Sequence, residues 1–412
     1  MHNISKQFAH KSKRNWIASN SQMNRVLTGP NSNHIHSWYF LTLLTAGHFF
    51  SDFYVNFLPI LLPFAISQLG LSLTLSGILT MIYSVASNLL QPVCGYYIDR
   101  SGYTWLLLWT IPLTAIFICW AGLAPSVPIL FAAVTLSGLA SSVFHPLASS
   151  MTTKIIRPES KGLAVSIFVA GGNFGFALAP IILTIFFATF SLDAIMWLTV
   201  PGIVLTAFYL HSRLYRLPLA AKTRLAEDAP KWYQSPTLLK LTLVMSLRSW
   251  PQYALTTFLP ILLSARGTEL TTVGLMLTVF LLGGAIGGFI GGFLGDRYGY
   301  QRCILASLAL SVIPCSIFLY LADTSLLAWI MIFLLGACMQ STVPASVVWA
   351  QKVMPQGAAM ASGMMLGLSF GLGGVGAAIT GVLADHIGLY EALVLTIIPL
   401  LISIPILYKI KQ

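Results

Sequence analysis

The chain has 412 residues, of which 57% are hydrophobic and only 8% are charged, and its formal net charge is +11. A soluble core could not bury so many apolar residues, so the composition excludes an ordinary soluble protein and indicates a membrane protein. The basic residues are scattered over short loops and form no single face, which argues against nucleic acid as a partner.

The apolar segments are each close to the length of about 20 residues that a helix needs to cross a bilayer. The alternating polarity that a transmembrane barrel requires is absent from the sequence. We therefore predict an all-α membrane protein. Its twelve transmembrane helices are expected at residues 38–66, 72–97, 103–123, 128–151, 163–190, 193–211, 237–264, 271–294, 302–321, 326–350, 358–383 and 390–408.

These helices form two groups of six, separated by one long polar connection. Residues 1–36 are polar and basic, so we expect a disordered cytoplasmic tail there. The predicted bundles are residues 37–211 and 237–412, joined by a cytoplasmic linker at 212–236. If the N-terminus lies inside, the basic loop residues fall on that side, except Arg266. This bias places both termini of a multi-pass membrane protein in the cytoplasm.

The two groups carry matching sequence features. "FLPILL" begins at Phe57 and again at Phe258, and "GYYIDRSG" from Gly95 matches "GFLGDRYG" from Gly292. Two matches in the same order, at nearly equal offsets, predict an internal repeat. Repeated halves are typical of transporters in which one half rocks against the other. We assign a gating role to the repeated loop motif, which consists of Gly95, Asp99, Arg100, Gly102, Gly292, Asp296, Arg297 and Gly299.

This Gly-x-x-x-Asp-Arg-x-Gly motif, together with twelve spans, resembles the loop signature of the major facilitator superfamily. "GHFFSD" at 47–52, "SSVFHP" at 141–146 and "GLAVSIFVAGGNFG" at 162–175 resemble its fosmidomycin-resistance branch. The resemblance implies a major facilitator fold, a location in the inner membrane and proton-coupled efflux, and hence drug resistance. It also implies that the loop motif latches the cytoplasmic side when the transporter faces outward.

Asp52 lies near the middle of the first predicted helix, where a carboxylate costs about 2.5–3.5 kcal/mol on insertion scales. His48, Asp52 and Asn56 are spaced by four residues and so form one polar stripe. Such a stripe must face the bundle interior or a water-filled cavity. We expect Asp52 to take up and release a proton, with His48 as its neighbour and relay.

The seventh predicted helix carries a second stripe, Arg248, Gln252 and Thr256, and the repeat makes Tyr253 the counterpart of Asp52. We expect Arg248 either to pair with Asp52, directly or through water, or to bind an anionic group of the substrate. The alternative is a structural ion pair that fixes the first helix against the seventh.

Three further polar residues lie within predicted spans. His145 precedes Pro146, so it either relays protons or bonds the carbonyl that the proline frees. Asn173 and Gln340 either contact substrate or form interhelical hydrogen bonds. The predicted proton-coupling residues are Asp52, His48 and His145. The predicted substrate-binding residues are Arg248, Asn56, Asn173, Gln252, Tyr253 and Gln340.

Glycines recur every four residues in the eighth predicted helix, at Gly283, Gly287, Gly291 and Gly295. We expect this face to allow close approach of a neighbouring helix.

The sequence shows no Walker motif, catalytic triad or metal-site spacing. We therefore expect a transporter and not an enzyme, driven by the proton gradient and without cofactor or metal. The predicted function is antiport of protons against a small, anionic molecule or drug, by a monomer in the lipid bilayer. A proton-coupled importer or facilitator would share all of these features.

Overall fold

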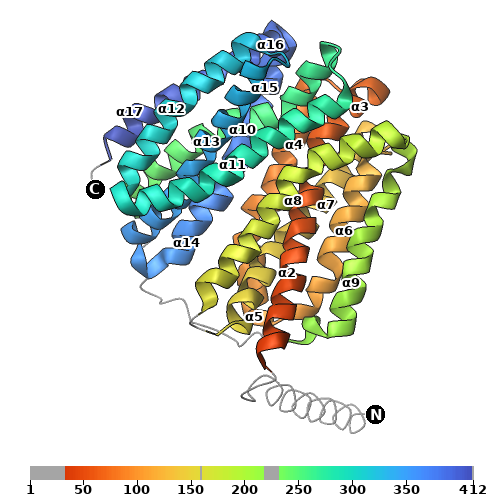
Figure 1. Cartoon of the computed structure of the whole chain (residues 1–412), viewed down its shortest axis with the longest axis vertical. Coiled ribbons are helices and arrows are strands. Elements are labelled where there is room, and N and C mark those ends of the chain that lie inside the picture. The colour runs from red at the N-terminus through yellow and green to blue at the C-terminus, as the bar shows by residue number, and fades with distance from the viewer. Residues whose placement is uncertain (1–32, 158–159, 218–231, 411–412) are drawn as a thin grey trace.

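The computed structural model describes residues 33–157, 160–217 and 232–410. Helices account for nearly all of them, and no strand occurs in these ranges. The predicted all-α fold is therefore confirmed. Figure 1 shows two bundles, one running from red to green and the other from green to blue. Of the predicted tail, only residues 33–36 are described, and they belong to the first helix.

Each bundle contains six spans, several of them built from two helical pieces. The first bundle consists of α2 (Asn33–Val55) with α3 (Leu58–Leu69), α4 (Leu73–Ser84) with η1 (Val85–Leu89) and α5 (Gln91–Ser101), η2 (Thr104–Leu106) with α6 (Leu107–Ala121), α7 (Val127–Ile155), α8 (Lys161–Thr189), and η4 (Leu192–Thr199) with α9 (Val200–Ser212). The second consists of α10 (Pro236–Ala265), α11 (Leu270–Tyr298), α12 (Tyr300–Leu321), α13 (Leu326–Val353), α14 (Ala358–Gly363) with η8 (Met364–Leu368) and α15 (Ser369–Ile387), and α16 (Leu389–Leu395) with α17 (Ile397–Tyr408).

The short 3₁₀ turns η5 (Leu214–Arg216), η6 (Trp232–Gln234) and η7 (Pro355–Gly357) complete the described elements. Residues 218–231, the middle of the predicted linker, lie outside the described ranges.

Eleven of the described spans are long and apolar enough to cross a membrane. The remaining predicted span, residues 237–264, corresponds to α10, which is 30 residues long. Its polar stripe around Arg248 and Gln252 lowers its mean hydropathy, so that length and not composition marks it as a span. α10 is thus the least apolar of the spans, and most of its side chains are buried.

Several helices extend past the predicted limits. The fourth span was expected to end at 151 and the eighth at 294, but α7 continues to Ile155 and α11 to Tyr298. Hydropathy falls where charged side chains begin, whereas backbone hydrogen bonding continues into the polar region of the bilayer. The apolar pattern therefore locates the spans but underestimates their length.

Several spans contain a break that the sequence pattern did not predict, among them the first, the second and the eleventh. The first is interrupted between α2 and α3, where Pro59 lies in the first turn of α3 and has no amide hydrogen to donate. The second and eleventh each contain one π-helical segment, η1 and η8, and these two segments contact each other. π-helical segments are frequent at functional sites.

The two ends of the molecule differ in how closely the bundles meet. We call the end that carries residues 101–104, 213–217 and 354–357 the linker end, and the end that carries 70–72, 322–325 and 388 the far end. α4 packs extensively against α15, and α3 against α10, in the far-end part of the structure. At the linker end, α5 and α14 make few contacts, so the bundles are closed at the far end and separated at the linker end.

The glycine face of α11 packs against α13, as predicted. A Cβ atom added at Gly283, Gly287 or Gly291 would collide with the backbone of α13. Gly288 lies on the adjacent face, where a Cβ would come no closer than 3.7 Å to Gln340. Close packing of the two helices therefore requires glycine at Gly287 and tolerates alanine at the adjacent Gly288.

We predict that Gly287→Ala lowers the apparent melting temperature of the detergent-solubilised protein, because overpacking costs roughly 1–3 kcal/mol. Gly288→Ala is the matched control, since it makes the same change in the same helix without a collision. Intrinsic fluorescence during heating measures both. Equal melting temperatures for the two variants would contradict the close approach at Gly287.

Candidate functional site

Asp52 lies on α2 between two histidines. His48 Nε2 lies 3.3 Å from Asp52 Oδ2, and His145 Nε2 lies 3.3 Å from Asp52 Oδ1. His48 comes from the same helix one turn earlier, whereas His145 comes from α7. The structure therefore brings together the three residues predicted for proton coupling, and we call them the triad.

The triad is only partly exposed. The side chains of Asp52 and His145 keep 20% and 21% of their exposure, while that of His48 keeps 11%. Asp52 is therefore neither sealed in a core nor free in water. A carboxylate in this position can exchange a proton with solvent and still interact strongly with its neighbours.

His48 is oriented by a bond on its other side. Its Nδ1 lies 2.7 Å from the backbone oxygen of Phe168 on α8. A carbonyl oxygen only accepts, so Nδ1 carries the hydrogen. A neutral His48 would then present a lone pair at Nε2 to the carboxylate oxygen of Asp52. Since two acceptors repel each other at this distance, this geometry favours a proton on Nε2 or on Asp52.

Two residues that the sequence analysis did not assign to the site shape this pair. The ring of Phe168 stacks on that of His48 with a centroid distance of 4.2 Å. A Cβ at Gly172 would lie 2.5 Å from His48 Nε2 and 2.6 Å from Asp52 Oδ2, so only glycine leaves room for the contact. Nothing in the sequence marks a backbone carbonyl as a partner, and Gly172 could have been found only as one of several glycines in the fifth span.

The donor atoms of the triad lie within 4.8 Å of one another. A cluster of this size can share a proton among its members, and by size it could also hold a metal ion.

Arg248 lies on α10 and its side chain is fully buried. One terminal nitrogen donates to Gln252 Oε1 at 2.8 Å, to the Met339 carbonyl at 3.1 Å and to Gln340 Oε1 at 3.2 Å. The other donates to Ser249 Oγ at 2.9 Å. The structure therefore brings Arg248 together with Gln252 and Gln340, two of the residues predicted to bind substrate.

The predicted pair of Asp52 and Arg248 is not formed as a direct contact. Among the described residues, the ion pairs of Asp52 are those with His48 and His145, and Arg248 has no carboxylate partner. Each charge is satisfied within its own bundle, by imidazole in the first and by neutral oxygen atoms in the second. The Nε atom of Arg248 is buried and has no hydrogen-bond partner.

Tyr253 lies where the two bundles meet. Its hydroxyl accepts from Asn88 Nδ2 at 3.4 Å, and Asn88 belongs to the π-helical segment η1 of the first bundle. The Arg248 guanidinium and the Tyr253 ring both approach Phe370 of α15, at 5.6 Å and 6.4 Å between centres. Tyr253 therefore links the second-bundle surroundings of Arg248 to the first bundle.

The remaining predicted substrate residues lie elsewhere. Asn56 is buried at the break between α2 and α3, where Nδ2 donates to the Phe176 carbonyl at 2.7 Å. That bond joins α2 to α8, so we no longer assign Asn56 to the substrate. Asn173 lies on α8 and is exposed.

The loop motif is described in part. The side chains of Asp99 and Arg100 lie outside the described residues. Asp296 Oδ1 accepts from the Tyr300 hydroxyl at 3.0 Å, and the Arg297 guanidinium lies 5.4 Å from the Tyr298 ring. Among the described residues, these contacts stay within the second bundle. The latch was expected for the outward-facing conformation, and for Asp296 and Arg297 it stays a prediction.

The glycines of the motif have a clear structural role. A Cβ at Gly95 would lie 3.3 Å from Pro146 of α7, and one at Gly292 would lie 3.5 Å from Pro344 of α13. Gly102 and Gly299 have φ angles of 65° and 93°, which end their helices in the region that favours glycine. The repeat is thus visible in packing as well as in sequence.

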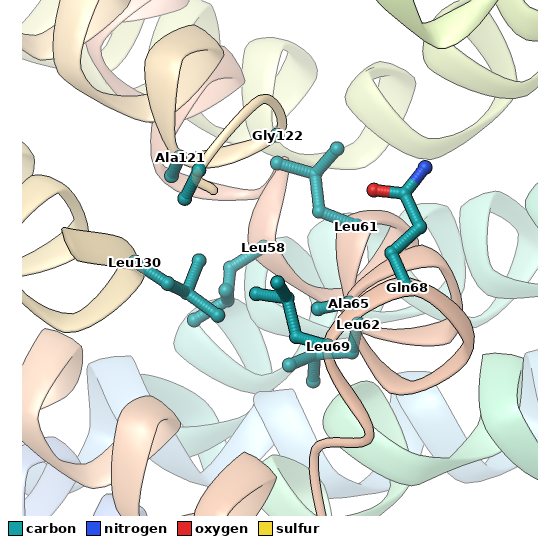
Figure 2. A pocket seen from close by; sticks show the side chains of 10 residues that line it. Leu58, Leu61, Leu62, Ala65, Gln68, Leu69, Ala121, Gly122 and Leu130 are labelled. Atoms are coloured by element: carbon teal, nitrogen blue, oxygen red, sulfur yellow. The ribbon is translucent and has the colours of Figure 1, made fainter. Parts of the chain in front are cut away.

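A small cavity in the first bundle, near the far end, is unrelated to these residues. Figure 2 shows it lined by aliphatic side chains such as Leu58, Leu61 and Leu130, with Gln68 as its polar member. It contains no charged residue and gives no indication of a substrate.

Two six-helix bundles that face each other, with charged residues buried along their spans, define a membrane transporter. The sequence profile of the Major Facilitator Superfamily matches residues 44–269 and 241–411. The chain therefore belongs to this superfamily.

Individual relatives agree with this assignment. The fosmidomycin resistance protein of Escherichia coli K12 is 28% identical over 359 residues, which cover 84% of this chain and 86% of the relative. The uncharacterized transporter YfnC of Bacillus subtilis 168 is 28% identical over 375 residues, which cover 86% and 88%. A bacterial homolog of the human lysosomal transporter Spinster, in an inward-facing and unoccupied conformation, has a TM-score of 0.77 at 16% identity. That structure covers 92% of this chain and 97% of its own, and it supports the fold alone.

We predict that His48 carries a hydrogen on Nδ1 whatever the charge of the triad, because the Phe168 carbonyl accepts from it. Solid-state ¹⁵N NMR of protein labelled at histidine measures this, with His48→Gln to assign the signal. His145→Gln is the control and should leave the Nδ1 signal of His48 in place. An unprotonated Nδ1 would contradict the orientation.

Proposed function

We propose that the protein exports a small, anionic molecule in exchange for protons, by alternating access of one site to the two sides of the membrane. The triad is the observation that carries this proposal. The geometry favours a bound proton, and the partial exposure of the triad supports exchange of that proton with solvent. The name of the Escherichia coli relative supports export and a drug-like substrate.

The triad is built to change its proton load at low cost. Histidine exchanges protons in the physiological pH range, and a carboxylate beside it can stabilise the charged form. When the proton leaves, the remaining negative charge is shared with His145, which approaches the other carboxylate oxygen. Both loaded and empty forms are therefore compensated inside the bundle, as a carrier of protons needs.

Arg248 supports an anionic substrate. A buried guanidinium is costly without a negative partner, and its contacts here are neutral oxygen atoms. Arginine matches the geometry of carboxylate and phosphate-like groups through two parallel hydrogen bonds. We propose that the substrate supplies the missing charge, with Gln252, Gln340 and Tyr253 as hydrogen-bonding neighbours.

The arrangement of the triad and Arg248 suits the exchange of protons for substrate. The structure has its bundles separated at the linker end, which we propose faces the cytoplasm because the basic loops gather there. In this conformation Arg248 would take up the substrate. In the opposite conformation the substrate would leave and the triad would be loaded from outside.

One electrostatic consideration favours a second candidate, proton-coupled import. A bound anion and an ionised Asp52 repel each other, so binding at Arg248 would favour a proton on the triad. Substrate and proton would then travel together. Flux measured under pH gradients of either sign separates the two directions.

We predict that Asp52→Asn abolishes transport of fosmidomycin driven by a pH gradient in vesicles containing the purified protein, because asparagine cannot carry the proton. Fosmidomycin is the first probe because a relative is named for resistance to it. Exchange of labelled for unlabelled compound should persist, since it needs no net proton movement. Asp193→Asn is the matched control, an exposed carboxylate in the first turn of η4. Gradient-driven flux by Asp52→Asn at the level of the control would reject the proton-carrier role.

Arg248→Gln should weaken binding of the transported anion by about 10- to 100-fold, the range that one or two charge-assisted hydrogen bonds supply. Lys240→Gln removes an exposed cation from the same helix and is the control. Concentration dependence of fosmidomycin exchange measures the loss. An unchanged half-saturating concentration would show that Arg248 does not hold the substrate, and it would leave the proton role of the triad untouched.

A further inference from the structure

Asp385, near the end of α15, makes a contact between the bundles that the proposed function does not use. Its Oδ1 accepts from the amide of Leu73 at 3.1 Å, and its Oδ2 accepts from the amide of Thr74 at 2.8 Å. Leu73 and Thr74 begin α4 in the first bundle, directly after the N-cap Ser72. One carboxylate from the second bundle thus satisfies two amides at a helix start that have no partner within their own helix.

The sequence around Asp385 repeats the pattern of the gating loops. Gly381, Asp385 and Gly388 have the same spacing as Gly95, Asp99 and Gly102. Gly388 has a φ of 100° and ends the helix, as Gly102 does with 65°. This third copy lies at the opposite end of the molecule from the first two.

The glycine of this copy brings the helices together. A Cβ at Gly381 would collide with the Leu73 carbonyl. Gly77 on α4 is equally close to the backbone of Ala377 on α15. Backbone contact between α4 and α15 therefore holds the first amides of α4 within reach of the Asp385 carboxylate.

Other contacts between the bundles gather in the same part of the structure. Thr257 donates to Thr80 at 3.4 Å, and the amide of Ile181 donates to Thr278 Oγ1 at 3.2 Å. Among the contacts described between the bundles, that of Asp385 is the one that engages a full charge. Because it joins the two bundles, it must break whenever the far end opens.

We propose that Asp385 is a latch that holds the far end of the transporter closed. It stabilises the conformation seen here, which is open toward the linker end, and it competes with the conformation in which the far end opens. The first two copies of the pattern then act at the linker end, and the third copy acts at the far end. Each end of the molecule therefore has a carboxylate of this pattern.

Distances between spin labels at the far end test the latch. Gln68→Cys and Thr324→Cys place labels on exposed positions of the two bundles, with the partly exposed Cys94 and Cys338 replaced by alanine. Asp385→Asn should raise the ratio of open to closed far-end distances about tenfold, which corresponds to 1.4 kcal/mol. The protein is the full chain in lipid vesicles without substrate.

Asp323→Asn is the matched control. Asp323 is an exposed far-end carboxylate that accepts from the amide and hydroxyl of Ser325, and this contact stays within the second bundle. Hydrogen bonding to Ser325 holds the pKa of Asp323 below its usual value, so both carboxylates carry the same charge at neutral pH. Equal distance distributions for the Asp385 and Asp323 variants would overturn the latch.

Leu73→Pro provides a second variant in case Asp385→Asn fails to fold. Leu73 is the first residue of α4, where proline is tolerated, and the change removes one donor while the carboxylate stays. It should shift the distances in the same direction as Asp385→Asn, by a smaller factor. A folded Leu73→Pro protein with wild-type distances would also overturn the proposal.

Discussion

The cost of placing charge inside a membrane governs the architecture of this protein. Asp52 is partly exposed and Arg248 is fully buried along their spans, and the hydrogen-bonding partners of each lie within its own bundle. The carboxylate is held by two imidazoles, whereas the guanidinium is held by amide, hydroxyl and carbonyl oxygens. Because neither bundle needs the other to satisfy its charge, the two can separate and rejoin without leaving an ion bare in lipid. That independence is a requirement for a transporter whose halves move.

The fold could be predicted from the sequence because the bilayer allows few solutions. Apolar length gave the twelve spans, and the matching sequences at Gly95 and Gly292 gave the two halves. The sequence pattern did not give the break after Val55 or the π-helical segments at Val85–Leu89 and Met364–Leu368. Hydropathy reports how apolar a segment is over a full span, whereas these features depend on single hydrogen bonds along it. The missed details therefore lie where the helices bend and meet.

The residues of the candidate site could be predicted from the sequence, but the partner that each of them contacts could not. A charged residue is easily recognised within an apolar span, and Asp52 and Arg248 could therefore be identified from the sequence. The repeat relates their heights in the membrane, yet it leaves open the direction in which each side chain points around its helix. His145 lies 93 positions after Asp52, as their numbers show, so no local spacing could join them. The Phe168 carbonyl, which orients His48, is a backbone group and leaves no trace in the sequence.

The contacts between the bundles must also be weak enough to break. The two hydrogen bonds that an exposed carboxylate accepts are worth about 1–3 kcal/mol. Moving a two-state equilibrium from 1:99 to 99:1 takes more, about 5.5 kcal/mol. A latch of that size biases the resting conformation but cannot fix it. The remaining free energy has to come from ligands that bind the two conformations differently, and we propose that the proton on the triad and the anion at Arg248 supply it. The division is physically sensible, because a stronger latch would trap the protein in one conformation and a weaker one would let it open without its load.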